Sequence, residues 1–370
     1  MTPAARTQAA IEILDDVIAA ARGAGAAADT LIKRYFKTRR YAGSKDRRAV
    51  REITYDCIRA LGEIPENGRS AALGARPDLK PHFGGEGHAP AALDDNDAPA
   101  IPGIAPAWLL ERLGDRAHPA LLDRAPIDLR VNSLKATRDD LLHLGTPIAD
   151  LPAALTGAPD DISRRPEYLD GLVEIQDAGS QRIAALCRAQ PGMNVLDLCA
   201  GAGGKTLALA GAMRNEGHII AADTDRGRLS ALTPRAERAG ATNIRTRLLN
   251  PNREMEALSE LTGQSDIVLI DAPCSGTGTW RRNPEAKWRL TPHRLDRLTA
   301  LQARLIRIGA KMVKPGGALV YAVCSLLPEE GDVQADAFAA GDFAETARML
   351  LTPQADGCDG FFIARFEKPC

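Results

Sequence analysis

Two cysteines that follow apolar runs are the residues of this chain best suited to covalent chemistry. Cys274 lies in DAPCSGTG, just after a run that ends at Asp271, and Cys324 lies in YAVCS, just after the run 318–323. Both runs have the short, apolar composition of buried strands. The carboxyl ends of neighbouring strands in an open α/β sheet face one crevice, so we expect the two thiols and Asp271 to lie close together.

Three other interpretations of these thiols compete with chemistry. A lone buried cysteine is usually a small core hydrophobe. A metal site needs further ligands, and the chain has neither a C-x-x-C pair nor histidines at ligand spacing, so no metal is expected. A redox pair would account for the cysteines but not for the glycines that follow Cys199. Nucleophilic chemistry uses a thiolate, which a positive charge stabilises, and Lys205 could supply that charge.

The segment LDLCAGAGGKT (196–206) has the glycines of a tight turn between a strand and a helix. A phosphate-binding P-loop would need glycine at Cys199, and a dinucleotide fingerprint that starts at Gly201 would need glycine at Thr206. Neither motif fits. What remains is a turn that lets a ligand approach the backbone, with the following helix N-terminus favouring a carboxylate.

Asp223 closes the next apolar run, where folds of this kind bind a ribose diol. A site for carboxylate, ribose and base suits S-adenosylmethionine as well as a dinucleotide. A tight turn without a ligand is the alternative, but it leaves the pairing of the glycines with Asp223 unexplained.

The C-terminal half alternates short apolar runs with helical patterns, which is typical of a parallel sheet covered on both faces. An additional strand, GFFIARFE (360–367), is expected to be an antiparallel edge. The other expected strands are 193–198, 218–223, 244–249, 266–271 and 318–323, and the expected helices are 204–214, 226–239 and 295–313.

The N-terminal part has a different character. Residues 1–80 are expected to form a helical domain, 81–103 a linker or irregular loop, 104–170 a small α+β module, and 171–370 the sheet domain. Within the first of these, 31–60 is locally basic and interleaved with aromatic residues, a composition that suits RNA. A solvated helical face is the alternative interpretation of this stretch.

Composition limits the class of protein. The chain has 370 residues with 45% hydrophobic content, which is enough for more than one core, and a formal net charge of −1 gives no global preference for a polyanion. No apolar run is long enough to span a membrane, and the N-terminus lacks a secretory pattern. Seven widely spaced cysteines suit reduced thiols, so we expect a cytoplasmic protein, and a monomer.

The motifs together resemble the RsmB/Sun-type RNA (cytosine-5) methyltransferases. The resemblance covers about 104–370, and its fold would be a Rossmann-like class I methyltransferase sheet, mostly parallel with an antiparallel last strand. A NusB-like helical N-terminal domain and a small α+β module would precede that sheet. The matching stretches are RVN (130–132), QDAGSQ (176–181), CAGAGGKT (199–206), DAPCSGTG with WRRNPEAKW (271–288), MVKPGG (312–317), YAVCSLLPEEG (321–331) and DGFF (359–362).

The resemblance implies a role for each matching position. Cys324 would be the nucleophile, Cys274 would assist product release, and Asp271 would bind the cytosine ring. A thiolate that adds at carbon 6 of cytosine makes carbon 5 nucleophilic enough to accept a methyl group, which is covalent catalysis. The expected S-adenosylmethionine-binding residues are Cys199, Ala200, Gly201, Ala202, Gly203, Gly204, Lys205, Asp223, Asn250 and Asp271.

Three positions depart from the family pattern. Val323 stands where threonine usually precedes the nucleophile, so a hydroxyl is missing there. Asn250 stands where an aspartate often lies near the adenine, and Gly201-Ala202 replace a common Ala-Pro. The change at Gly201-Ala202 keeps the turn, whereas the cofactor role of Asn250 depends on an amide instead of a carboxylate.

A cytosine must be unstacked to reach such a site, so the expected partner is single-stranded or loop RNA, ribosomal first and transfer RNA second. Trp280 and Trp288 could stack on a base or belong to a core. The rival functions are a non-catalytic RNA-binding or ribosome-assembly protein, a NAD-type oxidoreductase on the same sheet, and a methyltransferase for DNA or protein. The candidate RNA-binding residues are Arg281, Arg282, Lys287, Arg39, Arg40, Arg47 and Arg48.

Overall fold

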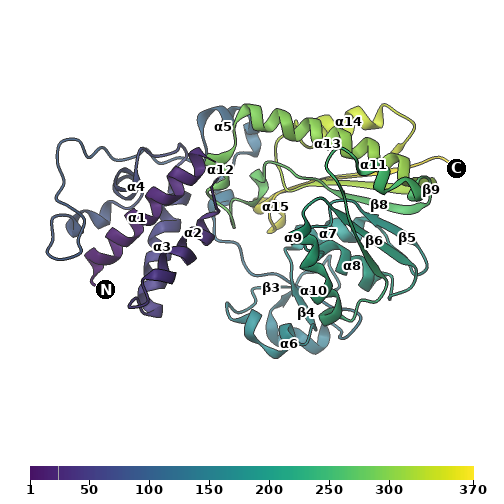
Figure 1. The fold of residues 1–370 in the computed structure, drawn as a ribbon, viewed down its shortest axis with the longest axis horizontal. Helices are drawn as coiled ribbons and strands as arrows, with labels where there is room; N and C mark the ends of the chain where they lie inside the picture. Colours follow the sequence, from purple (N-terminus) through teal and green to yellow (C-terminus); the bar gives the residue numbers. More distant parts are fainter. Residues whose placement is uncertain (24) are drawn as a thin grey trace. The chain divides into compact units, whose positions relative to one another are not determined.

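The computed structural model describes residues 1–23 and 25–370. The chain forms two compact units: the first contains 1–124 and 279–292, and the second contains 125–278 and 293–370 (Figure 1). The predicted boundaries at 103 and 170 do not separate these units. Residues 104–124 belong to the helical unit, and the small module is part of the sheet unit.

The first unit is helical. Apolar side chains at helical spacing, such as Ile13, Leu14 and Val17, are fully buried and pack with Val50 and Ile58 in one core. Between 83 and 106 the chain has no helix or strand apart from a single bridge between Leu61 and Pro102. The helices are α1 (Pro3–Arg22), α2 (Ala28–Thr38), α3 (Ser44–Ala60), α4 (Gly68–Ala75), α5 (Ala107–Leu113) and α12 (Ala286–Arg289), with 3₁₀ turns at Pro77–His82, Gly114–Arg116 and Pro119–Leu122.

The segment 279–292 belongs to this helical unit although it follows the Cys274 motif in the sequence. Trp288 is buried in the helical core, and its indole Nε1 donates to the Gly62 carbonyl at 3.1 Å. The Glu285 carboxylate accepts a hydrogen bond from the Ala28 amide at the start of α2, at 3.0 Å. Trp280 is also fully buried, so both tryptophans are core residues.

A small antiparallel sheet opens the second unit. Its strand order is β2-β3-β1-β4, and Arg130 of β1 pairs with Glu174 of β4. A 3₁₀ helix, Asp139–Leu144, lies between β1 and β2. The strands are β1 (Leu129–Val131), β2 (Thr146–Pro147), β3 (Ala154–Thr156) and β4 (Val173–Ile175), and a 3₁₀ turn (Ile162–Arg164) and α6 (Pro166–Leu169) lie between β3 and β4.

The main sheet has seven strands in the order β10-β11-β9-β8-β5-β6-β7. Five neighbouring strands, β9, β8, β5, β6 and β7, are parallel to one another. Strand β11 runs antiparallel to β9, and β10 runs antiparallel to β11. The predicted edge position of 360–367 is therefore wrong, because β10 covers that side. The strands are β5 (Asn194–Asp197), β6 (His218–Asp223), β7 (Ile244–Leu248), β8 (Ser265–Asp271), β9 (Val313–Val323), β10 (Ala344–Leu351) and β11 (Phe361–Glu367).

Helices cover both faces of this sheet. The expected helix 226–239 is two helices, because Pro234 cannot donate the backbone hydrogen bond that would join them. The helices are α7 (Ala178–Leu186), α8 (Gly204–Ala212), α9 (Arg226–Ser230), α10 (Leu232–Ala239), α11 (Glu254–Ala257), α13 (Pro292–Met312), α14 (Asp332–Ala339) and α15 (Pro353–Asp356), with 3₁₀ turns at Ser259–Leu261 and Thr277–Thr279.

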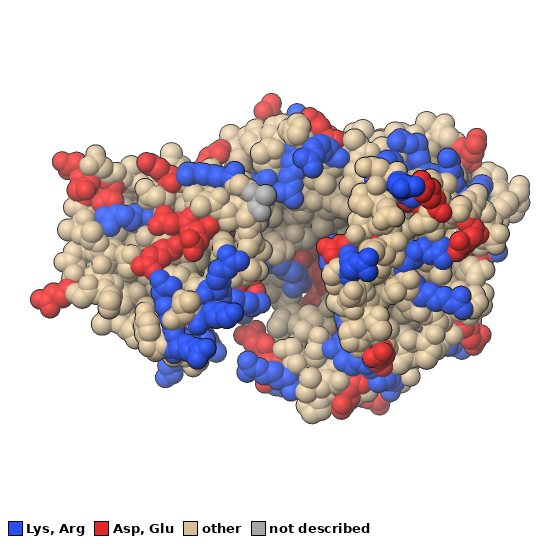
Figure 2. Space-filling view, viewed as in Figure 1, with Lys and Arg blue, Asp and Glu red and all other residues tan. Residues whose placement is uncertain are grey.

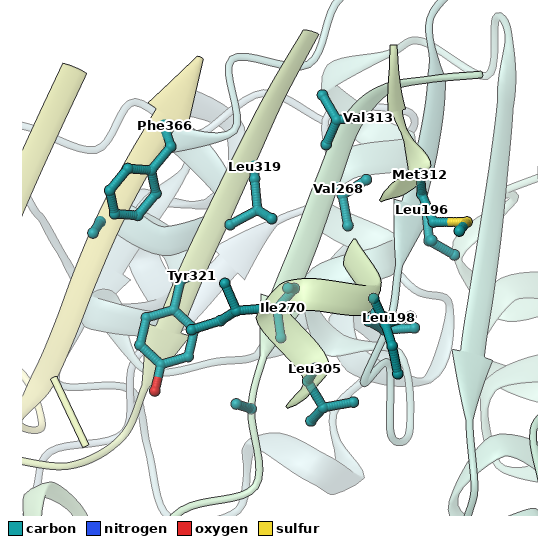
Figure 3. Close-up of a cluster of buried hydrophobic side chains, with 14 of the residues drawn as sticks. Leu196, Leu198, Val268, Ile270, Leu305, Met312, Val313, Leu319, Tyr321 and Phe366 are labelled. Carbon is teal, nitrogen blue, oxygen red and sulfur yellow. The ribbon is translucent and has the colours of Figure 1, made fainter. Parts of the chain in front are cut away.

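Alternating side chains of the strands fill two cores. Leu196, Val268, Ile270, Leu319 and Tyr321 point to the face covered by α13 and α14 (Figure 3). Their neighbours in sequence point to the opposite face, against α7 and α8. Because both faces of the sheet are buried, a site can form at the carboxyl ends of its strands. No helix within 1–23 and 25–370 is long and apolar enough to cross a membrane.

Candidate active site

The glycine turn after β5 requires glycine at two positions. Gly201 and Gly203 have φ angles of 54° and 82°, a region that side chains with a Cβ rarely adopt. A Cβ on Gly203 would also lie 2.0 Å from Leu232 Cδ1. The turn therefore places the first residue of α8, Gly204, directly beyond the end of β5.

Asp223 holds this turn against the end of β6. Its carboxylate accepts hydrogen bonds from the amides of Gly201 and Asp225, each at 2.7 Å. Each carboxylate oxygen can accept a further bond, as a ribose diol would require. The predicted residue Asn250 is different, because it lies beyond β7 and is exposed.

Asp197 adds a buried carboxylate beside the turn. Its Oδ2 accepts a hydrogen bond from the Thr206 hydroxyl at 2.7 Å, whereas its Oδ1 has no partner among the described residues. Burial raises the pKa of Asp197 to about 7, although the bond from Thr206 opposes that shift. Burial and the carboxylates of Asp197, Asp223 and Asp271 also raise the pKa of the Cys199 thiol.

Lys205 and Asp271 join the glycine turn to the end of β8. The ammonium of Lys205 lies 2.6 Å from Asp271 Oδ2. Burial alone would lower the pKa of Lys205, but the ion pair with Asp271 outweighs it and raises that pKa above its ordinary value. Cys324 is among the groups that act on Lys205 electrostatically, so the cation, the carboxylate and the thiol share one site.

The two predicted thiols are in contact. Cys274 Sγ lies 3.2 Å from Cys324 Sγ, and both side chains are partly exposed. The hydrogen bond to Cys324 raises the pKa of Cys274 well above its ordinary value, and burial and Glu330 act in the same direction. Cys274 therefore keeps its proton and can donate it to the Cys324 sulfur.

A buried polar network supports both thiol-bearing turns, and the sequence analysis did not identify it. The carboxylate of Glu330 accepts hydrogen bonds from the Ser275 amide at 2.8 Å, from the Ser275 hydroxyl, and from Gln302 Nε2 at 2.9 Å. The Ser325 hydroxyl lies 3.1 Å from that of Ser275 and 3.0 Å from that of Thr277. Ser275, which follows Cys274, and Ser325, which follows Cys324, therefore connect the two turns by hydrogen bonds.

The signal for this network was present in the sequence. Ser275 and Ser325 each follow a thiol, and Glu330 lies in the short LLPEEG link between a strand and a helix. Glu330 is fully buried, and the Tyr321 hydroxyl donates to its backbone carbonyl at 2.6 Å. A buried carboxylate needs such partners, but its partners come from distant parts of the sequence.

Two of the predicted RNA-binding residues are buried in the helical unit. Lys287 has no exposed surface, and its ammonium donates to the Arg59 carbonyl at 3.1 Å. Burial lowers the pKa of Lys287 to about 7. Arg281 is 7% exposed. Burial argues against phosphate contacts by these two side chains, which corrects the prediction that they bind RNA. The side chain of Arg282 is partly exposed.

The predicted basic residues of α2 and α3 lie at the surface of the same unit. Figure 2 shows Lys and Arg side chains gathered around the lower ends of these two helices. Arg39 stacks on the Tyr35 ring and pairs with Glu12, and Arg47 donates to the Ala42 carbonyl. The exposed cations with no acceptor among the described residues are Arg34, Lys37, Arg40, Lys45 and Arg48.

Comparison with known proteins identifies the family. Residues 184–367 match the family model described as 16S rRNA methyltransferase RsmB/F. The ribosomal RNA small subunit methyltransferase B of Salmonella arizonae is 35% identical over 290 residues, which cover 72% of this chain. The chain belongs to the RsmB/Sun-type methyltransferase family. It spans 66% of the length of the Salmonella protein.

Solved structures agree with the RsmB/Sun-type assignment. A methyltransferase homolog protein from Pyrococcus horikoshii is 29% identical, covers 70% of this chain and 94% of its own, and has a TM-score of 0.62. The crystal structure of PH0851 covers 100% of this chain and 99% of its own with a TM-score of 0.78 at 23% identity. The predicted Rossmann-like methyltransferase fold is confirmed, and with it S-adenosylmethionine as the cofactor.

The residues at the RsmB/Sun-type glycine turn fit that cofactor. The carboxylates of Asp197, Asp223 and Asp271 surround the turn together with the cations Lys205 and Arg228, and carboxylates suit the sulfonium and ammonium groups of S-adenosylmethionine. The N-terminus of α8 suits its carboxylate. Within 1–23 and 25–370, no cluster of histidine, cysteine, aspartate and glutamate is arranged to hold a metal ion.

Proposed function

We propose that the protein methylates carbon 5 of a cytosine in RNA through a temporary covalent bond between Cys324 and carbon 6 of the base. The observation that supports this most directly is the pair of thiol sulfurs, 3.2 Å apart, beside the ion pair of Lys205 and Asp271. Two thiols at one site allow one to form the bond to the base and the other to assist its removal.

The first step needs the Cys324 sulfur as a thiolate. Lys205 supplies a positive charge nearby, and the Cys274 thiol can donate a hydrogen bond to the Cys324 sulfur. A positive charge and a hydrogen-bond donor are the groups that can pair with the sulfur anion that this step needs. The sulfur then adds to carbon 6. The electron pair of the carbon 5–carbon 6 double bond moves into the carbon 4–carbon 5 bond, and that of the carbon 4–nitrogen 3 double bond moves onto nitrogen 3, so carbon 5 becomes nucleophilic.

Asp271 receives the edge of the cytosine ring in this proposal. Its carboxylate is partly exposed at the end of β8, and Lys205 holds it from one side. The Lys205 ammonium can pass a proton through this carboxylate to ring nitrogen 3, on which addition increases the electron density. Bound S-adenosylmethionine would supply an electrophilic methyl group to carbon 5, and S-adenosylhomocysteine would remain.

Release reverses the addition. A base, assisted by Cys274, takes the proton from carbon 5, and the freed electron pair restores the double bond and expels the Cys324 sulfur as a thiolate. The network of Glu330, Ser275 and Ser325 holds the two turns during both steps. Asp223, Asp197 and the turn from Cys199 to Lys205 bind the cofactor, with Asn250 as a further candidate beyond β7.

The proposed substrate is ribosomal RNA, with transfer RNA as the second candidate. The Salmonella relative carries a ribosomal RNA small subunit name, and its aligned residues cover 72% of this chain. An unstacked cytosine is required, because the sulfur must approach the face of the ring, which neighbouring bases cover in a duplex. The exposed cations of α2 and α3 are candidates for phosphate contacts.

The test is methyl transfer from labelled S-adenosylmethionine to purified ribosomal RNA and transfer RNA. The account predicts incorporation into one RNA, mapped to one cytosine by bisulfite sequencing, and a loss of at least about a thousandfold in Cys324→Ala. Incorporation into DNA or protein instead, or unchanged transfer by Cys324→Ala, would contradict the proposed function.

A further inference from the structure

Arg130 is a buried cation that the catalytic proposal does not use. It lies in β1 of the small sheet and is 6% exposed. Its Nε donates to Gln176 Oε1 at 2.6 Å, and within 1–23 and 25–370 this is the one hydrogen bond of its side chain. The two terminal nitrogens are not among the polar atoms sealed from solvent. Four N–H donors of a guanidinium are therefore free to bind a ligand.

The surroundings of Arg130 carry an excess of positive charge. Glu174, its cross-strand partner, is 2% exposed and is already paired with Arg235 at 2.7 Å and with Arg238. Three guanidiniums thus share one carboxylate. Burial lowers the pKa of Arg130 only to about 10, so the side chain is charged at neutral pH. An anionic ligand would balance this cluster.

The cluster lies beside the glycine turn. Gln176, which accepts from Arg130, has its Nε2 at 3.7 Å from the position that a Cβ would take on Gly204, the first residue of α8. Arg235 donates to the Ala202 carbonyl at 2.6 Å. The first amides of α8 also favour an anion, because they lack partners within the helix and lie at its positive end.

We propose that Arg130 and the N-terminus of α8 together bind an oxyanion. The choice of anion rests on the proposed function, which supplies two sources of the same chemistry: the carboxylate of S-adenosylmethionine and a phosphate of the RNA next to the target cytosine. A guanidinium binds either one with two parallel hydrogen bonds.

Calorimetric titration with S-adenosylhomocysteine and with methylthioadenosine tests the carboxylate source. The second compound has the same nucleoside and sulfur but no carboxylate. If the cofactor carboxylate is the ligand, Arg130→Gln weakens binding of S-adenosylhomocysteine about tenfold or more and leaves methylthioadenosine unchanged. Arg238→Gln is the matched control, because its guanidinium is already paired with Glu174, and it should weaken S-adenosylhomocysteine binding clearly less than Arg130→Gln does.

RNA titration over a range of salt concentrations tests the phosphate source. In that case Arg130→Gln weakens RNA binding, lowers the slope of log affinity against log salt by about one, and leaves S-adenosylhomocysteine unchanged. If Arg130→Gln does not fold, Arg130→Lys keeps the charge without the paired donors and should show a smaller loss for the same ligand.

Unchanged binding of both RNA and S-adenosylhomocysteine by the folded variants would overturn the inference. An equal loss for S-adenosylhomocysteine and methylthioadenosine would overturn it too, because the effect would then not depend on the carboxylate. Failure of the wild-type protein to bind S-adenosylhomocysteine would instead contradict the proposed function, and this inference with it.

Discussion

The sulfur atoms of Cys274 and Cys324 lie 3.2 Å apart, at the ends of two adjacent parallel strands. That separation suits a hydrogen bond and exceeds the length of a disulfide bond, about 2 Å. Both sulfurs can therefore contact the same bound base. In the proposed mechanism Cys324 forms the first bond and Cys274 assists the release step.

Replacing Cys274 separates these two roles. In Cys274→Ala, the Cys324 sulfur should still add to the base, but the product should not be released. A protein–RNA adduct should therefore persist on a denaturing gel. The double variant Cys274→Ala/Cys324→Ala is the control and should form no adduct. If Cys324→Ala forms the adduct and Cys274→Ala does not, the two roles are exchanged.

Glu330 is expected to act as a positioning residue. Glu330→Gln keeps the volume of the side chain but weakens the bonds to the Ser275 amide and hydroxyl. We expect the free energy of unfolding to fall by about 1–3 kcal/mol, because hydrogen bonds to a buried charge are lost. Release should slow more than cofactor binding weakens, so the turnover number should fall while the affinity for S-adenosylhomocysteine is kept. An affinity loss equal to the loss in turnover would contradict a positioning role.

Asp197 should make stability depend on pH. Its pKa is about 7 in the folded protein and near 3.8 when unfolded. Between these values the folded state keeps a proton that the unfolded state has lost, so this group lowers the free energy of unfolding as pH rises. The free energy of unfolding of Asp197→Asn, measured by urea unfolding without ligand, should rise relative to that of the wild type by about 1–3 kcal/mol from pH 4 to pH 8. A difference independent of pH would contradict the raised pKa.

The exposed cations of the helical unit should contribute to RNA affinity through phosphates. Arg40→Gln and Arg48→Gln should each weaken RNA binding and lower the salt slope by about one. Lys80→Gln is the control, because Lys80 is also exposed but lies in the 3₁₀ turn Pro77–His82, outside the segment 28–60. Equal effects from all three variants would indicate a general charge effect without a defined surface.

The sequence was sufficient to predict the sheet and the two thiols, because strand ends in a parallel sheet share one edge. It did not predict β10, since AETARMLL has no regular alternation of apolar and polar residues and is largely exposed. That omission placed β11 wrongly at the edge. The hydrogen bonds of Glu330 escaped prediction for another reason: they join residues from 275 to 330, whose proximity depends on the folded turns.

The segment 279–292 shows a second limit of the sequence. Its arginines and lysine, read in isolation, suit phosphate contacts. In the structure Lys287 and Trp288 pack with residues more than 200 positions earlier in the chain. A basic motif that follows the Cys274 motif can therefore form part of the core of another unit, which local composition does not reveal.

The most direct test is peptide mapping of the trapped complex. Cys274→Ala is incubated with substrate RNA and S-adenosylmethionine, digested with nuclease and protease, and analysed by tandem mass spectrometry. We predict a methylated cytidine mass attached to the peptide that contains Cys324. Attachment to any other residue, or an adduct that carries no methyl group in the presence of the cofactor, would contradict the proposed mechanism.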